Sequence, residues 1–350
     1  MAAMNPALPE KGVAKAGGKE SNNWVPFRRD PRDCSPLRAR YPEDNMSAVP
    51  NARPGQSGRE TRKVTVPEIL KKKSRHEPIT CLTAYDYPTA RVVDEAGVDI
   101  ILVGDSLAMV VLGHHDTLAV TMDEMLHHTR AARRGTQRAL LVADMPFGSY
   151  QIDLTGAVAN AVRFVKEAGA EAVKIEGGEK RLELIARLAE NDIPVMGHVG
   201  LTPQSVHALG GFKMQGKTLP AAEQLLRDAH AVEAAGAFSL VLESIPAEVA
   251  ERITAELRIP TIGIGAGPAC DGQVLVLHDL MGLSFGVHPK FVRRYTDLRA
   301  ALDQAVRGFC TDVVKGGFPG EAETTHLAAE VREQWFTPQK AGLARSSTRS

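Results

Sequence analysis

The chain has few cysteines, no excess of charge of either sign and no long apolar run. Its four cysteines, Cys34, Cys81, Cys270 and Cys310, are scattered and form no CxxC pair, so neither a disulfide framework nor a structural zinc site is expected. A reducing cytoplasm is the simplest location. The 42 basic and 42 acidic residues balance, which argues against a general nucleic-acid binder. No uninterrupted apolar stretch is long enough to span a bilayer, so no membrane partner is expected.

Both ends of the chain lack packing signals. Residues 1–60 are rich in polar residues, proline and glycine and show no apolar periodicity, which predicts a disordered extension. A secretory signal would need an apolar core of about 7–15 residues, and an organelle transit peptide would be poor in acids such as Glu10 and Asp30. The polar segment 334–350 is predicted to be a short loose tail.

Between these ends, apolar runs alternate with helical patterns. Strands are expected at 79–84, 99–103, 139–143, 170–176, 193–199, 238–243 and 260–264, with a weaker eighth near Met281–Phe285. Helices are expected at 88–96, 121–134, 155–168, 180–191, 220–235 and 246–257. Thr121 with Glu124 three residues later is typical of a capping box.

Eight strands separated by helices imply parallel pairing through crossover connections. The span of roughly 260 residues is close to the ~250 of a (β/α)₈ TIM barrel. We therefore predict an α/β fold with one catalytic barrel domain over 61–333. A doubly wound open sheet is the alternative, and it would bind a ligand at one switch point.

Carboxylates follow three successive strands of this predicted barrel. Asp105, Asp144 and Glu176 end strands two, three and four, at the end of the barrel where active sites lie. Converging carboxylates raise one another's pKa, and a divalent cation would relieve that repulsion. Oxygen ligands favour a hard ion such as Mg²⁺. For one isolated carboxylate, a helix cap or a surface ion pair is the plainer interpretation. For three at equivalent strand ends we favour the metal.

Lys174 shares one face of its strand with Ala172 and Glu176, because side chains alternate along a strand. It could be a Schiff-base nucleophile, a clamp for a substrate anion or the ion-pair partner of Glu176. A lysine two residues from a metal ligand should keep its charge, which favours the clamp over the nucleophile. The ion pair remains a competing interpretation.

Three further side chains follow predicted strands. Ser106 could bind an anionic group or cap the next helix, and the sequence leaves these two roles even. His198, at the end of strand five, could be a hydrogen-bonded core residue, contact substrate or support the metal. Glu243 ends strand six after an apolar run, where burial can raise the pKa of a carboxyl towards the range of a general base. A cap is less expected, since Glu is a poor N-cap.

Six segments in the same order resemble the ketopantoate hydroxymethyltransferase family over about 63–320. No single segment is decisive, but their joint order is specific. They are Thr83-Ala84-Tyr85-Asp86, Val103-Gly104-Asp105-Ser106-Leu107, Ala143-Asp144-Met145-Pro146-Phe147, Val173-Lys174-Ile175-Glu176-Gly177-Gly178, Gly197-His198-Val199-Gly200-Leu201-Thr202-Pro203-Gln204-Ser205 and Ile262-Gly263-Ile264-Gly265-Ala266-Gly267. Two departures are Ala108, where the family usually has glycine, and the segment Phe318–Glu323, which diverges from the usual ending.

The resemblance implies a Mg²⁺-dependent hydroxymethyltransferase of pantothenate biosynthesis. It would transfer a one-carbon group from 5,10-methylenetetrahydrofolate to 3-methyl-2-oxobutanoate, giving 2-dehydropantoate, and would form homo-oligomers, typically decamers. The implied residues are Asp105, Asp144 and, directly or through water, Glu176 for Mg²⁺; Asp105, Ser106, Asp144 and Lys174 for the 2-oxo acid; and Glu243 as proton acceptor.

Two other functions fit the same residues. One is a related Mg²⁺-dependent barrel lyase or aldolase that acts on another 2-oxo acid without folate. The other is a non-catalytic barrel used as a binding or assembly module, which would require the three carboxylates to bind no metal.

Overall fold

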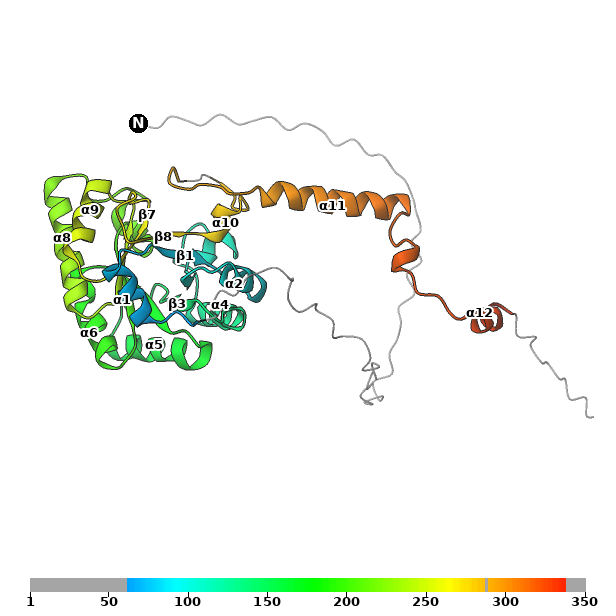
Figure 1. Cartoon of the computed structure of the whole chain (residues 1–350), viewed down its shortest axis with the longest axis horizontal. Coiled ribbons are helices and arrows are strands. Elements are labelled where there is room, and N and C mark those ends of the chain that lie inside the picture. Colours follow the sequence, from blue (N-terminus) through cyan, green and yellow to red (C-terminus); the bar gives the residue numbers. More distant parts are fainter. Residues whose placement is uncertain (1–61, 287–288, 338–350) are drawn as a thin grey trace, which may run out of the picture. The chain divides into compact units, whose positions relative to one another are not determined.

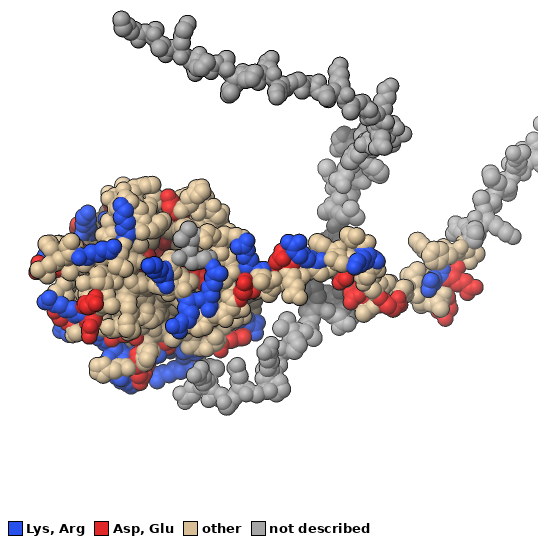
Figure 2. All heavy atoms as spheres, turned by 90° about the horizontal axis from the view of Figure 1, so that it is seen from above, with Lys and Arg blue, Asp and Glu red and all other residues tan. Residues whose placement is uncertain are grey.

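The computed structural model describes residues 62–286 and 289–337. The extension predicted over 1–60 and residues 338–350 of the predicted tail lie outside the described residues. Within the described part, no helix is both long and apolar enough to cross a membrane. Basic and acidic side chains both occupy the face of the barrel that Figure 2 presents.

Eight parallel strands close into a barrel in the order β1 to β8, with β8 pairing back to β1. The closed sheet confirms the predicted TIM barrel and excludes the open sheet (Figure 1). The strands are β1 (Ile79–Thr83), β2 (Ile100–Val103), β3 (Leu140–Asp144), β4 (Ala172–Glu176), β5 (Val195–Gly200), β6 (Ser239–Glu243), β7 (Thr261–Ile264) and β8 (Gly272–Leu275).

The predicted position of the eighth strand is wrong. β8 is Gly272–Leu275, whereas Met281–Phe285 is a turn in which the Leu283 N–H donates to the His278 carbonyl at 2.8 Å. Gly272 pairs with Ile79, and a Cβ there would lie 2.5 Å from the Ile79 carbonyl oxygen. Barrel closure therefore selects a short glycine-containing strand, whose weak apolar signal is easily missed.

Helices follow most of the strands. They are α1 (Val66–Ser74), α2 (Tyr87–Glu95), α3 (Leu107–Val110), α4 (Met122–Gly135), α5 (Leu154–Ala168), α6 (Leu182–Glu190), α7 (Val206–Leu209), α8 (Leu219–Ala234), α9 (Ala247–Glu256), α10 (Leu277–Leu280), α11 (Leu298–Lys315) and α12 (Ala329–Phe336). The capping box predicted for α4 is confirmed: the Glu124 N–H donates to Thr121 Oγ1, and Glu124 Oε2 accepts from the Thr121 N–H.

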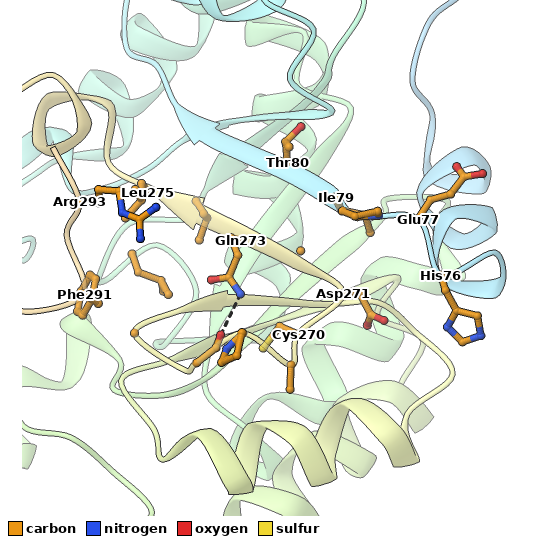
Figure 3. Close-up of a pocket in the computed structure, with 18 of the residues that line it drawn as sticks. His76, Glu77, Ile79, Thr80, Cys270, Asp271, Gln273, Leu275, Phe291 and Arg293 are labelled. Carbon is orange, nitrogen blue, oxygen red and sulfur yellow. Dashed lines mark hydrogen bonds between the residues drawn. The ribbon is translucent and has the colours of Figure 1, made fainter. Parts of the chain in front are cut away.

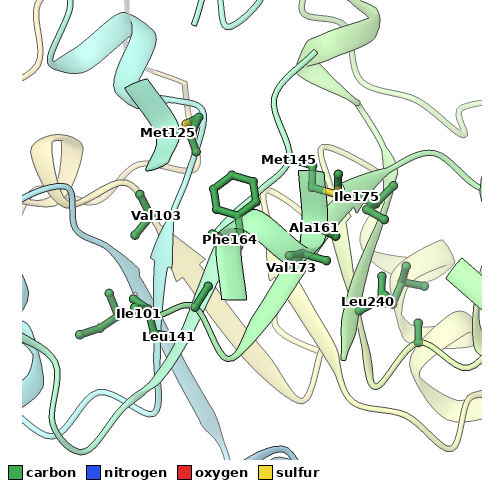
Figure 4. Packing of buried hydrophobic residues seen from close by; sticks show 14 of the residues in the cluster. Ile101, Val103, Met125, Leu141, Met145, Ala161, Phe164, Val173, Ile175 and Leu240 are labelled. Carbon is green, nitrogen blue, oxygen red and sulfur yellow. The ribbon is translucent and has the colours of Figure 1, made fainter. Parts of the chain in front are cut away.

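The apolar core has two layers because strand side chains alternate. One cluster, with Ile100, Val142 and Ala172, fills the barrel interior. The other packs the outer strand faces against the helices, with Val173 and Phe164 among its members (Figure 4). Each fully buried side chain of this size contributes about 1.5–3 kcal/mol to stability. The alternation confirms that Lys174 and Glu176 lie on the interior face with Ala172.

Candidate active site

The predicted charged residues meet at one mouth of the barrel. Asp144 pairs directly with Lys174 in the register of β3 and β4. The Asp105 N–H, just after β2, donates to Asp144 Oδ2 at 3.0 Å. Asp105, Asp144, Lys174 and Glu176 are each at most 5% exposed. Charged groups are rarely so buried without a partner, so this cluster is an exceptional feature of the barrel interior.

Lys174 forms its shortest ion pair with Asp144 rather than with Glu176. Its Nζ lies 2.7 Å from Asp144 Oδ1 and 3.8 Å from Glu176 Oε1. Burial alone would lower the pKa of Lys174, but Asp144, Glu176 and Asp105 outweigh burial and raise the pKa above its usual value. The ammonium therefore stays protonated, which disfavours the Schiff-base interpretation, because that chemistry needs the neutral amine.

The three carboxylates are in different electrostatic environments. Burial, followed by the charges of Asp144 and Glu176, raises the pKa of Asp105 well above its usual value. Burial would also raise the pKa of Glu176, but the contacts with His198 and Lys174 outweigh it and lower the pKa. The cluster thus carries repulsion that an added cation would relieve.

The donor set fits a hard divalent cation. All three candidate ligands are carboxylates, the ligand type that Mg²⁺ prefers. Glu176 Oε1 is buried and has no hydrogen bond, only ion-pair contacts of 3.5 Å or longer with His198 and Lys174. Among the described residues, no three His, Cys, Asp or Glu side chains already stand at metal-binding spacing. The three carboxylates therefore fit a divalent cation in their chemistry and burial but not yet in their spacing. Lys174 neutralises Asp144 in this arrangement.

His198 lies between two carboxylates. Its Nδ1 is 3.5 Å from Glu176 Oε1, and its Nε2 is 3.3 Å from Glu243 Oε2. Burial and the Lys174 charge would lower the pKa of His198, but Glu176 and Glu243 outweigh both and raise it to about 9. At neutral pH a buried imidazolium therefore lies between Glu176, a candidate metal ligand, and Glu243.

The close approach of β5 to β6 fixes the position of Glu243. Gly200 pairs with Glu243 and has φ +98°, a conformation that favours glycine. A Cβ on Gly200 would lie 2.3 Å from the Glu243 carbonyl oxygen. The Glu243 side chain is 16% exposed. The N-cap of α9 is Pro246, so Glu243 is not a helix cap.

Ser106 contacts a residue that sequence reasoning did not assign. Its Oγ lies 2.9 Å from the hydroxyl of Tyr85, and it makes no side-chain cap bond to α3. Ser106 thus stands at the N-cap position of α3, but its hydroxyl does not cap the helix. Tyr85 is 1% exposed, and its carbonyl contacts His128 Nδ1 at 2.8 Å.

Two further residues of the site, Gln204 and Tyr150, are not predicted from the sequence. Gln204 donates to Asp105, and its backbone N–H donates to Glu176, while the Tyr150 hydroxyl lies 2.6 Å from Gln204 Oε1. The only signal was that Gln204 follows strand five in the segment Pro203-Gln204-Ser205. Neutral polar residues after a strand are too common for that signal to select them.

The loop Gly263–Gly267 packs against the chain that follows it. A Cβ on Gly265 would lie 2.5 Å from Phe291 Cδ1. This loop borders a groove of about 840 Å³ on β1, β7 and β8, which contains none of the charged mouth residues and is lined by side chains such as Cys270, Gln273 and Arg293 (Figure 3). Gln273 Nε2 donates to the Gly267 carbonyl at 3.0 Å. Close packing of neighbouring side chains against this loop accounts for these glycines.

The His198 imidazolium predicts a pH-dependent stability of the metal-free protein. The pKa of His198 is about 9 in the folded protein and ~6.5 in an unfolded chain. Because the folded state binds the proton more tightly, protonation of His198 stabilises the fold, and this contribution is complete below pH ~6.5. That contribution is lost as pH rises through about 9, and amounts to roughly 3 kcal/mol. The free energy of unfolding, measured with urea in the presence of a chelator below pH ~6.5 and above pH ~9, gives this loss.

The variant His198→Asn should lose this pH dependence, whereas His230→Asn should keep it, because His230 is a half-exposed partner of Glu256 on α8. If the free energy of unfolding depends on pH equally in wild type and in His198→Asn, the assignment of the imidazolium is contradicted.

Comparison with known proteins identifies the family. The model of the family "Ketopantoate hydroxymethyltransferase" matches residues 63–321. The chain is 60% identical over 270 residues to 3-methyl-2-oxobutanoate hydroxymethyltransferase of Koribacter versatilis (strain Ellin345), covering 77% of this chain and 92% of that protein. It is 56% identical over 263 residues to the protein of the same name from Geobacter metallireducens, covering 75% of this chain and 98% of that protein.

Among solved structures, a phosphonopyruvate hydrolase is similar with a TM-score of 0.50 and 16% identity, covering 77% of this chain and 95% of that chain. At this identity the likeness supports the barrel fold alone. The match to the family model covers residues 63–321, which include all eight strands and every charged residue at the mouth of the barrel. This chain belongs to the ketopantoate hydroxymethyltransferase family.

Proposed function

We propose that this chain, a hydroxymethyltransferase of pantothenate biosynthesis by family, converts 3-methyl-2-oxobutanoate to 2-dehydropantoate with 5,10-methylenetetrahydrofolate as one-carbon donor. The observation that carries the proposal is the meeting of Asp105, Asp144 and Glu176 at one mouth of the barrel in a member of this family. Within the described residues the three cysteines are free, in keeping with a reducing cytoplasm.

The residues at the mouth divide between the metal and the substrate. Asp105, Asp144 and Glu176 would hold Mg²⁺, which when bound supplies Lewis-acid stabilisation of the substrate's oxygen. Lys174, kept protonated by its neighbours, offers a positive charge to the 2-oxo acid carboxylate. Ser106, held by Tyr85, offers its hydroxyl and backbone N–H to the same anion.

Glu243 is proposed as the general base. Its carboxylate would take the proton from C3 of the 2-oxo acid, and the electron pair left on C3 would attack the methylene carbon of the folate. Both bonds from that carbon to the folate nitrogens would break: C3 replaces one nitrogen and a water oxygen replaces the other. The two nitrogens take up the proton removed from C3 and one proton of the water, and tetrahydrofolate leaves. His198, 3.3 Å from Glu243 Oε2, holds that carboxylate in place. In this proposal, His198 supports the site without contacting the substrate.

A product assay tests the reaction. Purified protein with Mg²⁺ and 3-methyl-2-oxobutanoate should form 2-dehydropantoate only when 5,10-methylenetetrahydrofolate is present. Turnover of a 2-oxo acid without folate would favour the lyase alternative. The absence of turnover in both assays, together with no heat of Mg²⁺ binding, would favour a non-catalytic barrel.

We also propose that the chain forms a homo-oligomer through α11, with a second copy of the chain as the occupant of its apolar face. None of the residues of α11 is buried. Leu302, Val306, Phe309 and Val313 are each 46–58% exposed and recur at helical spacing, so they form one stripe. Contiguous exposed apolar surface of this kind marks an interface. The decamer typical of the family is the expected assembly.

The variant Phe309→Glu is expected to shift the protein to a smaller species, because a carboxylate at the centre of the stripe cannot be buried without a partner. Analytical ultracentrifugation measures the change. Gln304→Glu, which adds a charge on the opposite face of α11, is the matched control and should leave the mass unchanged. An unaltered mass in Phe309→Glu would remove the stripe as the interface.

A further inference from the structure

Gln204 is a buried amide whose polar groups are all used. It lies in the single turn Pro203–Ser205 after β5 and is 6% exposed. Its Nε2 donates to Asp105 Oδ2 and to the Met145 carbonyl, both at 2.9 Å. Its Oε1 lies 2.6 Å from the Tyr150 hydroxyl and 3.1 Å from Gln151 Nε2. Such complete satisfaction in a buried site specifies one orientation.

The neighbours settle which end of the amide faces Asp105. A backbone carbonyl can only accept hydrogen bonds, so the group facing Met145 must be the NH₂ of Gln204. The same NH₂ faces Asp105 Oδ2. The Tyr150 hydroxyl then donates to Oε1 and accepts from the Glu176 N–H at 3.2 Å. Tyr150 therefore locks the amide with its two hydrogens towards Asp105 and Met145.

Gln204 connects two carboxylates from strands that are not adjacent. Its side chain binds one oxygen of Asp105, after β2, and its backbone N–H donates to Glu176 Oε2, on β4, at 2.9 Å. The other oxygen of Glu176, Oε1, is buried without a hydrogen bond and has only longer ion-pair contacts, with His198 Nδ1 at 3.5 Å and Lys174 Nζ at 3.8 Å. One residue thus holds one oxygen of each carboxylate, and Gln204 does not bond the second oxygen of either.

We propose that Gln204, locked by Tyr150, is a positioning residue that fixes Asp105 and Glu176 for binding a divalent cation. This inference rests on the proposed function, because it assigns the second oxygen of each carboxylate to the Mg²⁺ of that reaction. Groups that hold metal ligands in this way typically affect metal affinity by about 10–100-fold. Gln204 itself does not touch the substrate or the metal.

The test is Mg²⁺ binding measured by calorimetry without substrate. Gln204→Met keeps the length of the side chain and removes its donors, and should weaken Mg²⁺ binding about 10–100-fold. Tyr150→Phe should also weaken Mg²⁺ binding, because it removes the hydroxyl that orients the amide. The double variant should lose less than the sum of the single losses, because both act through one amide. Gln137→Met, at an exposed position, is the matched control and should bind like wild type.

Steady-state kinetics separate positioning from a merely structural role. Raising Mg²⁺ should restore kcat of Gln204→Met. Because a bound cation also stabilises a weakened fold, the circular-dichroism spectrum and urea midpoint of Gln204→Met without metal must first match those of wild type. If wild type binds Mg²⁺ and Gln204→Met binds within twofold of it, the role of Gln204 is overturned while the proposed function stands. If wild type binds no Mg²⁺, the metal assignment in the proposed function fails first. Should Gln204→Met not fold, unchanged affinity in Tyr150→Phe overturns the proposal.

Discussion

The variant Glu243→Gln is expected to bind Mg²⁺ and 3-methyl-2-oxobutanoate as wild type does but to stop exchange of the C3 hydrogen into D₂O. A positioned base typically contributes about 10²–10⁴-fold, and an amide cannot accept the proton at neutral pH. Glu243 is suited to this role because its side chain is 16% exposed and is held by His198 on one side. Proton NMR of the keto acid in D₂O, with Mg²⁺ and without folate, measures the exchange.

Glu248→Gln is the matched control, since Glu248 is an exposed acid in the first turn of α9. It should leave both exchange and turnover unchanged. Exchange at the wild-type rate in Glu243→Gln would remove Glu243 as the base. Loss of keto acid binding in the same variant would instead indicate that Glu243 contacts the substrate before proton transfer.

The variant Lys174→Met is expected to destabilise the metal-free protein by about 3–5 kcal/mol, the typical effect of removing one partner of a buried ion pair. Asp144 would be left buried beside Asp105 without the ammonium that now lies 2.7 Å away. Mg²⁺ should restore more stability to this variant than to wild type, because the cation replaces the missing charge. Urea unfolding with chelator and with Mg²⁺ measures both effects.

Two controls sharpen this experiment. Lys180→Met, at an exposed position, should leave stability unchanged, and Lys174→Arg should retain part of it by keeping the charge. A loss below about 1 kcal/mol would contradict a net stabilising role, since exposed pairs have that value. The KM for the keto acid at saturating Mg²⁺ then separates the clamp from a simple counter-ion: an unchanged KM would leave Lys174 as the neutraliser of Asp144.

Local pattern was enough to place most of the barrel. Apolar runs that end on a carboxylate located β2, β3 and β4, and Thr121 with Glu124 located the start of α4. These signals are local, because strand alternation and helix capping depend on residues a few positions apart. β8 escaped because Gly272–Leu275 is specified by its pairing with Ile79 across the closed sheet, a contact nearly 200 residues away in the chain.

The candidate site divides in the same way. Residue types and strand ends pointed to Asp105, Asp144, Lys174, Glu176 and Glu243, since buried charge is rare enough to stand out in a sequence. Their partners could not be predicted. The pairing of Lys174 with Asp144 rather than with its near neighbour Glu176 depends on the register between β3 and β4. The alternation of side chains along a strand determines on which side of the sheet a residue lies. It does not determine which residue of the neighbouring strand lies beside it.

Gln204 and Tyr150 illustrate the limit most clearly. A glutamine and a tyrosine in loops carry no signal of their own, and they matter here because three loops of the barrel bring them against Asp105 and Glu176. The identity of the charged groups follows from composition and periodicity, which are properties of short segments. Their orientation and protonation follow from burial and from hydrogen bonds between segments distant in the chain, which exist only once the barrel has closed.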